Sequence, residues 1–176
     1  IIDSAPDISK IDVTPTGYST TVLAANGEET ATLVGQGANR QYVTIDEIPL
    51  DLQHAFVAIE DERFYDHNGI DLHGIGRAFI SGLSKGRFSE GASTITQQLI
   101  KNNVLTSWTS ETSFVEKLQR KIQEQYLALE LEKQVKDKDW ILENYMNSVN
   151  LGANTLGVQA ASKKYFNKDV SELTLS

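Results

Sequence analysis

This chain is organised around residues 60–71, which read Glu-Asp-Glu-Arg-Phe-Tyr-Asp-His-Asn-Gly-Ile-Asp (EDERFYDHNGID). They follow an apolar helical run from Leu52 to Ile59, so we expect the acidic head to emerge at the end of a buried helix. Aromatic side chains follow closely and exclude water from a neighbouring carboxylate, which favours a general base. The alternative is an acidic surface turn after a helix, because clustered acids mark functional sites only on average.

A length of 176 residues suits one domain with a core of its own. No run approaches the roughly 18 apolar residues of a membrane span, and no signal peptide is visible. The first residue is not Met and the last six read as the start of a helix, so we expect a fragment of a longer protein. Without cysteine there is no disulfide and no thiolate metal site. The net charge of −8 argues against nucleic acid as a partner.

The basic residues are concentrated in one segment. Between Leu72 and Thr109 the only acid is Glu90, against the four basic residues Arg77, Lys85, Arg87 and Lys101. A basic segment inside an acidic protein indicates a local anion site rather than a general polyelectrolyte surface.

Pattern and turn signals predict a mainly α fold with a short N-terminal β-hairpin. Residues 18–23 and 30–34 are rich in threonine and β-branched residues and flank Asn26-Gly27, a strong hairpin signal. We interpret residues 1–48 as a hairpin and linker, and residues 49–176 as a helical catalytic domain with a truncated C-terminus. Helices are predicted at 50–59, 71–84, 93–104, 112–134, 137–149 and 158–166.

The helix predicted at 93–104 carries polar side chains suited to an anionic ligand. Thr94 and Gln97 fit a capping box, and the preceding Gly-Ala-Ser-Thr would leave backbone N–H groups exposed at the helix start. Gln97, Gln98 and Lys101 add donors along its first turns. We favour a polar ligand site, and a well-capped amphipathic helix without a ligand is the alternative.

The longest predicted helix, 112–134, is apolar on two sides and therefore interior. Arg120 and Glu124 lie four residues apart, so their side chains face each other on a surface that is buried or lines a cleft. They form either part of a site or a structural ion pair.

The two carboxylates Glu60 and Glu124 lie on either side of the basic, donor-rich segment at residues 72–109. One carboxylate can deprotonate an acceptor hydroxyl, while cations and helix N–H groups neutralise a phosphate leaving group. The combination indicates transfer of a sugar from a phosphate. A hydrolase would instead place two acids on either side of the scissile bond.

Four sequence blocks resemble one family in order and spacing. They are Glu60-Asp61-x-x-Phe64-x-x-His67-x-Gly69; Gly91-x-Ser93-Thr94-Ile95-Thr96-Gln97-Gln98 with Lys101-Asn102; Arg120-Lys121-x-x-Glu124; and Ile141-Leu142-Glu143-x-Tyr145-x-Asn147 with Gly152 and Gly157. Together they resemble the peptidoglycan glycosyltransferases, the catalytic domain of class A penicillin-binding proteins and their monofunctional relatives (glycosyltransferase family 51).

The resemblance implies a lysozyme-like, two-lobed helical fold with a membrane-facing jaw. It implies polymerisation of lipid II into β-1,4-linked glycan with inversion, and release of undecaprenyl pyrophosphate. The expected partners are lipid II, the growing glycan chain and the surface of the cytoplasmic membrane, on its extracytoplasmic face. The resemblance also allows a C-terminal transpeptidase domain in the parent chain, and the sequence leaves open whether one follows.

Residue by residue, the resemblance makes Glu60 the base and Glu124 the second essential carboxylate. It implies a substrate-contacting set of Arg77, Ser93, Gln97, Gln98, Lys101 and Arg120. It also implies a divalent cation, Mg²⁺ or Mn²⁺, whose ligands no block identifies. The sequence departs from some relatives because residues 103–112 contain no basic residue, so this part of the expected pyrophosphate contact has no matching side chain.

Two rival functions and one membrane prediction remain open. The rivals are a catalytically idle glycan-binding module, which the retention of both glutamates disfavours, and a lysozyme-type hydrolase, which would not need the cationic set.

The apolar side chains between the first two blocks are predicted to form the jaw that dips into the membrane rather than ordinary core; they are Ile75, Phe79, Ile80, Leu83 and Phe88.

Overall fold

The structure is a computed structural model that describes residues 5–10, 12–33, 40–77, 93–105, 113–153 and 155–175. Its helices include α1 (Leu50–Glu60), α3 (Ile95–Asn103), α4 (Phe114–Val135), α5 (Lys138–Met146) and α6 (Val158–Phe166). Residues 72–77 are also helical, and short 3-10 helices lie at Ile8–Lys10, Ile45–Glu47 and Val170–Glu172. The predicted fold class, mainly α with an N-terminal hairpin, is confirmed.

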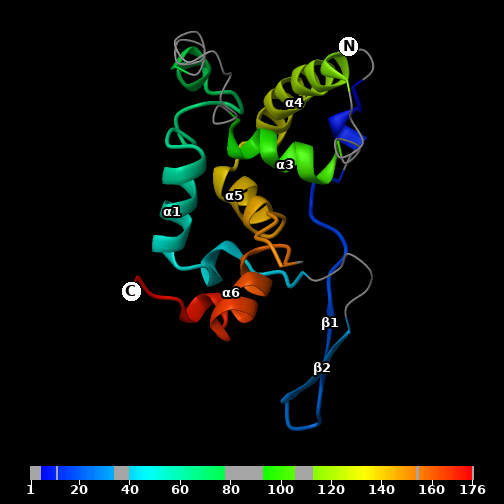
Figure 1. Ribbon diagram of the computed structural model, residues 1–176, viewed down its shortest axis with the longest axis vertical. Coiled ribbons are helices and arrows are strands. Elements are labelled where there is room, and N and C mark those ends of the chain that lie inside the picture. The colour runs from blue at the N-terminus through cyan, green and yellow to red at the C-terminus, as the bar shows by residue number, and fades with distance from the viewer. Residues whose placement is uncertain are drawn as a thin grey trace.

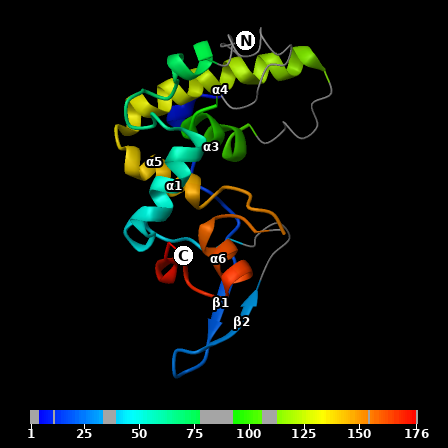
Figure 2. The ribbon, with the colours of Figure 1, turned by 60° about the vertical axis from the view of Figure 1, so that its left-hand side comes forward.

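The hairpin consists of β1 (Thr20–Leu23) and β2 (Glu29–Leu33), which pair antiparallel around the predicted Asn-Gly turn. Gly27 has a φ of +86°, a conformation that glycine adopts without steric cost. In both ribbon views the hairpin extends away from the helices (Figures 1 and 2). It therefore takes no part in positioning the carboxylates described below.

Helix α3 lies between α4 and α5 and forms the centre of the core (Figure 1). Its Ile95, Leu99 and Ile100 side chains are fully buried. They pack with buried residues of α4 and α5, among them Leu127, Leu131, Ile141, Leu142 and Met146. Burial of each such side chain contributes roughly 1.5–3 kcal/mol, so the position of α3 is strongly determined.

Side-chain caps fix where two of the core helices begin. Thr94 Oγ1 accepts a hydrogen bond from Gln97 N at the start of α3, which completes the predicted capping box. Asp137 caps α5 in the same way through Trp140 N. A cap sets the first residue of a helix, so the Thr94 cap also determines which side chains of α3 face α4.

The prediction that α1 and α4 are interior helices was only partly correct. In α1 Gln53 is the only buried side chain, and Ile59, next to Glu60, is 81% exposed. The buried residues of α4 begin at Glu124, and Phe114 and Val115 at its start are exposed. Helix α3 packs on the later part of α4, so the apolar stripe of the first turns has less to pack against in the part of the chain described.

The N-terminal segment is more than a linker. Ile8 and Val13 are buried in the core, and Asn103 at the end of α3 donates a hydrogen bond of 3.0 Å to the Val13 carbonyl. The domain boundary at residues 48 and 49 stays a prediction. Phe79, Ile80, Leu83 and Phe88 of the predicted jaw lie outside the described residues. Among the helices described, none has the length and apolar composition needed to cross a membrane.

The fourth block anchors the chain that leads into α1. Glu143 on α5 accepts hydrogen bonds from the Tyr42 hydroxyl and from Ile45 N. Asn147 pairs with the backbone of Val43 through both ends of its amide, at 3.0 and 2.8 Å. These bonds join segments about 100 residues apart and fix α1 beside α5.

Candidate active site

The turn after α1 places two neighbouring carboxylates in opposite environments. Glu60 ends α1 with an exposed side chain, whereas Asp61 is 6% exposed. Asp61 lies 2.9 Å from His67 Nε2 and accepts a hydrogen bond from Ile95 N at the start of α3. Asp61 therefore attaches the turn to α3 and leaves Glu60 facing solvent.

Gly69 allows the turn to approach α4 closely. It has a φ of +91°, and a Cβ at this position would lie 2.6 Å from the Ala128 carbonyl oxygen. The Gly69 carbonyl accepts a hydrogen bond of 2.7 Å from Thr94 Oγ1. The glycine of the first block is thus required by packing, and it joins the turn to both α3 and α4.

The aromatic side chains of the turn do not shield Glu60 in the way the sequence led us to expect. Phe64 is fully buried and packs edge-on against Tyr65 and His67, with Lys138 Nζ 4.5 Å from its ring centre. Tyr65 donates a long hydrogen bond to Asp139. Phe64 therefore belongs to the core that supports the turn.

A cleft of about 260 Å³ opens beside Glu60. Its lining includes residues 60–63, Asp71, Gly74, Arg77, Ser93 and Thr94. Arg63 holds Asp71 through two hydrogen bonds, of 3.3 and 2.5 Å. Burial acts to raise the pKa of Asp71, but the hydrogen bonds from Arg63 and the Gly74 backbone outweigh it, so this pKa is lowered.

Glu60 is held in the cleft by an amide from α3. Gln98 Nε2 donates a hydrogen bond of 3.0 Å to Glu60 Oε2. Gln98 Oε1 in turn accepts one of 3.2 Å from the hydroxyl of Tyr145. The structure thus brings together two residues that the sequence assigned to the site and adds a third that it did not.

Glu124 lies in a different environment, between two cations. It is 1% exposed; Arg120 donates to its Oε1 and Lys121 Nζ to its Oε2, the latter at 2.9 Å. The prediction that Arg120 and Glu124 face each other on a buried or cleft-lining surface is confirmed. Lys121 was missed as a site residue, although its spacing of three from Glu124 places it on the same side of the helix.

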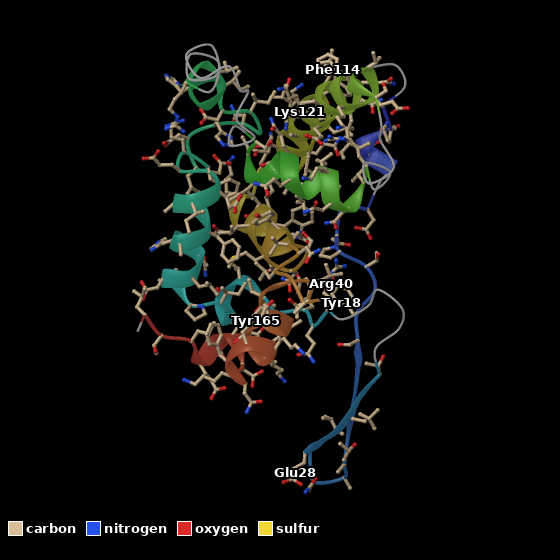
Figure 3. The ribbon with its side chains drawn as sticks, in the orientation of Figure 1. Tyr18, Glu28, Arg40, Phe114, Lys121 and Tyr165 are labelled. Carbon is tan, nitrogen blue, oxygen red and sulfur yellow. The ribbon has the colours of Figure 1, made fainter. Side chains whose placement is uncertain are left out.

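Lys121 connects this cluster to the cleft. Its Nζ donates a hydrogen bond of 2.7 Å to Ser93 Oγ, and Ser93 lines the cleft beside Glu60. Lys121 also donates to Gln97 Oε1 at 3.4 Å. Figure 3 shows Lys121 well along α4 from the exposed Phe114 at its start. Adjacent residues of α3 therefore contact the two parts of the site, Gln98 at Glu60 and Gln97 at Lys121.

The remaining predicted site residues differ in accessibility. Arg77 lines the cleft and lies 4.0 Å from Glu62, with both side chains largely exposed. Lys101 is half-buried and follows Gln97 by four residues, on the same side of α3. Gln97 is 1% exposed, so contact between its side chain and a substrate would require its neighbours to move.

Comparison with known proteins identifies the family of this chain. A family model described as transglycosylase matches residues 26–176. Penicillin-binding protein 1A of Clostridium botulinum is 50% identical over 143 residues, 78% of this chain and 16% of that protein. Penicillin-binding protein 1F of Bacillus subtilis is 44% identical over 158 residues, 90% of this chain and 21% of that protein.

Penicillin-binding protein 1A/1B of Bacillus subtilis is 39% identical over 176 residues, 99% of this chain and 18% of that protein. The chain therefore spans about a fifth of the length of these relatives. The family model covers most of the chain, and it confirms the resemblance inferred from the four blocks. This chain belongs to the transglycosylase family, among the glycosyltransferase domains of class A penicillin-binding proteins.

Proposed function

We propose that this chain is a peptidoglycan glycosyltransferase that polymerises lipid II into β-1,4-linked glycan strands with inversion. Undecaprenyl pyrophosphate is the leaving group, and the reaction takes place at the extracytoplasmic face of the cytoplasmic membrane. One observation carries the proposal: an exposed carboxylate in a cleft is connected through Ser93 to two cations held by a buried carboxylate.

Glu60 is suited to act as the base. Its side chain is exposed in the cleft, and one oxygen, Oε2, is engaged by Gln98. The other oxygen can take the proton of the acceptor 4-hydroxyl as that hydroxyl attacks the anomeric carbon of the donor. Such positioned proton transfer contributes about 10²–10⁴-fold to a rate.

The cations are suited to the leaving group. A pyrophosphate gains negative charge as the sugar–phosphate bond breaks, and it needs charge neutralisation rather than a proton. Arg120 and Lys121 are partly exposed, at 19% and 37% of their side chains, so they can reach a phosphate. Lys101 and Arg77 are the further candidates for this contact.

Glu124 is suited to orient these cations rather than to act as a second acid. Each of its oxygens accepts from one cation, and the side chain is almost inaccessible. A glycoside hydrolase would need two carboxylates flanking the bond. This arrangement therefore favours transfer from a phosphate over hydrolysis.

A divalent cation, Mg²⁺ or Mn²⁺, stays a proposal, and no protein ligands are assigned to it. Among the residues that the structure describes, no three His, Asp or Glu side chains gather where they could hold a metal ion. The described residues thus do not fit a protein-held Mg²⁺ or Mn²⁺, and the steps above use only the side chains of the chain itself.

The test is incubation of the chain with labelled lipid II in the presence of lipid or detergent, followed by separation of the products by length. We expect a ladder of glycan strands that disappears with Glu60→Gln. Asp51→Asn, on the same helix but in its first turn, is the control and should retain the ladder. Cleavage of finished glycan without a ladder would instead establish a hydrolase, and binding without turnover would establish an idle module.

A further inference from the structure

Tyr145 is a fully buried side chain of α5 whose hydroxyl donates to Gln98, the residue that holds the candidate base. Its ring packs edge-on against Phe56 of α1, with ring centres 6.1 Å apart. Phe56 and Glu60 are four residues apart and so lie on the same side of α1. Tyr145 thus contacts this side of α1 through its ring and, through Gln98, the carboxylate one turn further along.

The hydrogen bonds from Tyr145 to Glu60 run in one direction only. An ionised carboxylate only accepts, so the NH₂ group of Gln98 must face Glu60. The carbonyl oxygen of Gln98 then faces Tyr145, whose hydroxyl must donate. If the amide turned over, Gln98 Oε1 would face Glu60 Oε2 and the two oxygens would repel each other.

The surroundings of Tyr145 keep its hydroxyl a donor. Burial raises the pKa of Tyr145, and the negative charge of Glu60 raises it further. The phenol therefore stays protonated at any pH at which the chain works. The amide of Gln98 accordingly has one preferred orientation, set from a fully buried position.

We propose that Tyr145 is a positioning residue for Glu60 and acts through Gln98. Its hydroxyl fixes the Gln98 amide, which holds Glu60 Oε2 and leaves Oε1 for the proton of the acceptor hydroxyl. Among the described residues, Glu60 Oε1 takes no hydrogen bond. The inference rests on the proposed function, in which Glu60 is the base.

The experiment is Tyr145→Phe, which keeps the ring and its packing on Phe56 and removes only the hydroxyl. We expect kcat to fall about 10-fold, because the base is less well held, while KM stays within twofold. The melting temperature should fall by about 2–4 °C for the loss of one partly buried hydrogen bond.

Tyr42→Phe is the matched control. Tyr42 also donates its hydroxyl to a carboxylate, Glu143, and the structure shows no contact between it and Glu60 among the described residues. It should lose a similar amount of melting temperature and keep kcat. Equal kcat values for Tyr145→Phe and the parent chain, or equal losses in both variants, would overturn the proposal.

A double-mutant cycle between Tyr145 and Gln98 distinguishes positioning of Glu60 from a general loss of rigidity in the site. In a Gln98→Leu background the path from Tyr145 to Glu60 is already broken, so adding Tyr145→Phe should change kcat by less than twofold. Full additivity of the two substitutions would mean that Tyr145 acts by another path, and the proposal would fail.

A readout independent of turnover distinguishes this inference from the proposed function. The side-chain amide of Gln98, assigned in a ¹⁵N-labelled sample by its absence in Gln98→Leu, should shift in Tyr145→Phe and in Glu60→Gln but not in Tyr42→Phe. An amide signal that Tyr145→Phe leaves unchanged overturns the positioning role. A shifted signal in a chain that makes no glycan would show that the hydrogen-bond path from Tyr145 to Glu60 exists and that the proposed activity is what fails.

Discussion

Glu60 and Glu124 are the same residue type in opposite surroundings. Glu60 is exposed in a cleft and receives one neutral hydrogen bond from Gln98. Glu124 is buried between two cations. Among the described residues, Glu60 has one oxygen without a hydrogen bond and is open to an acceptor hydroxyl, whereas both oxygens of Glu124 accept from a cation. The comparison indicates that burial and hydrogen-bond partners give two glutamates different roles: Glu60 as the base and Glu124 as the group that orients the cations.

Glu60→Gln tests the exposed half of this comparison and should have the largest effect. It keeps the shape of the side chain and removes its basicity, so turnover should fall about 10³-fold with an unchanged melting temperature. Single-turnover assays with lipid II beside a thermal melt measure both. Near-normal turnover by the folded variant would remove Glu60 as the base.

Glu124→Gln tests the buried half. Turnover should fall about 10²-fold because Arg120 and Lys121 lose the group that orients them. The free energy of unfolding should fall by about 1–2 kcal/mol, since both cations can turn to water.

The control for Glu124→Gln is Glu130→Gln, on the same helix. Glu130 pairs with the largely exposed Lys133, so its loss should cost under about 0.5 kcal/mol and no activity. Full turnover by the folded Glu124→Gln variant would reduce that glutamate to a structural ion pair.

Lys121→Ala sharpens the comparison, because it tests whether the cations bind the phosphate of a ligand or only pair with Glu124. Charge-assisted hydrogen bonds to phosphate contribute about 1.5–3 kcal/mol, and the partial exposure of Lys121 favours the lower end. Affinity for phosphoglycolipid inhibitors of the moenomycin type should therefore fall about 10-fold, and comparably in Arg120→Ala and Lys101→Ala. Lys133→Ala is the control, and unchanged affinity in all three site variants would separate the cations from the phosphate.

Asp71→Asn should have the smallest effect, on stability at acid pH. The pKa of Asp71 is lowered in the folded chain, so its contribution is fully present above about pH 4 and is lost as the pH falls through the lowered value. Between pH 5 and pH 2.5 the melting temperature of Asp71→Asn should decline less than that of the parent, by about 2 °C. A parallel decline would show that Arg63 does not stabilise the ionised form of Asp71.

The sequence predicted the elements well where the pattern is local. The cap at Thr94 and the Asn-Gly turn are short-range signals, and the structure has α3 beginning directly after the cap and a strand on either side of the turn. Exposure was predicted less well, because the apolar residues of α1 and the start of α4 do not reveal how much of each helix a neighbour covers.

The sequence predicted the site only as far as the four blocks identify its residues, and it did not predict which of these residues contact each other. Tyr145 could not be placed, since its contact with Gln98 joins residues 47 apart in the chain. Lys121 offered a signal in its spacing from Glu124, but that spacing alone does not show that Ser93 and Gln97 complete its surroundings. The buried position of Gln97 likewise follows from packing and not from its own block.

The adjacent amides of Gln97 and Gln98 impose a condition on the length of α3. Successive side chains on a helix point about 100° apart, and here one serves Lys121 and the other Glu60. Inserting or deleting one residue between Thr94 and Gln97 would rotate both amides away from their partners at once, while leaving each residue present. Relatives that keep this site therefore cannot change the residue count of the first turn of α3.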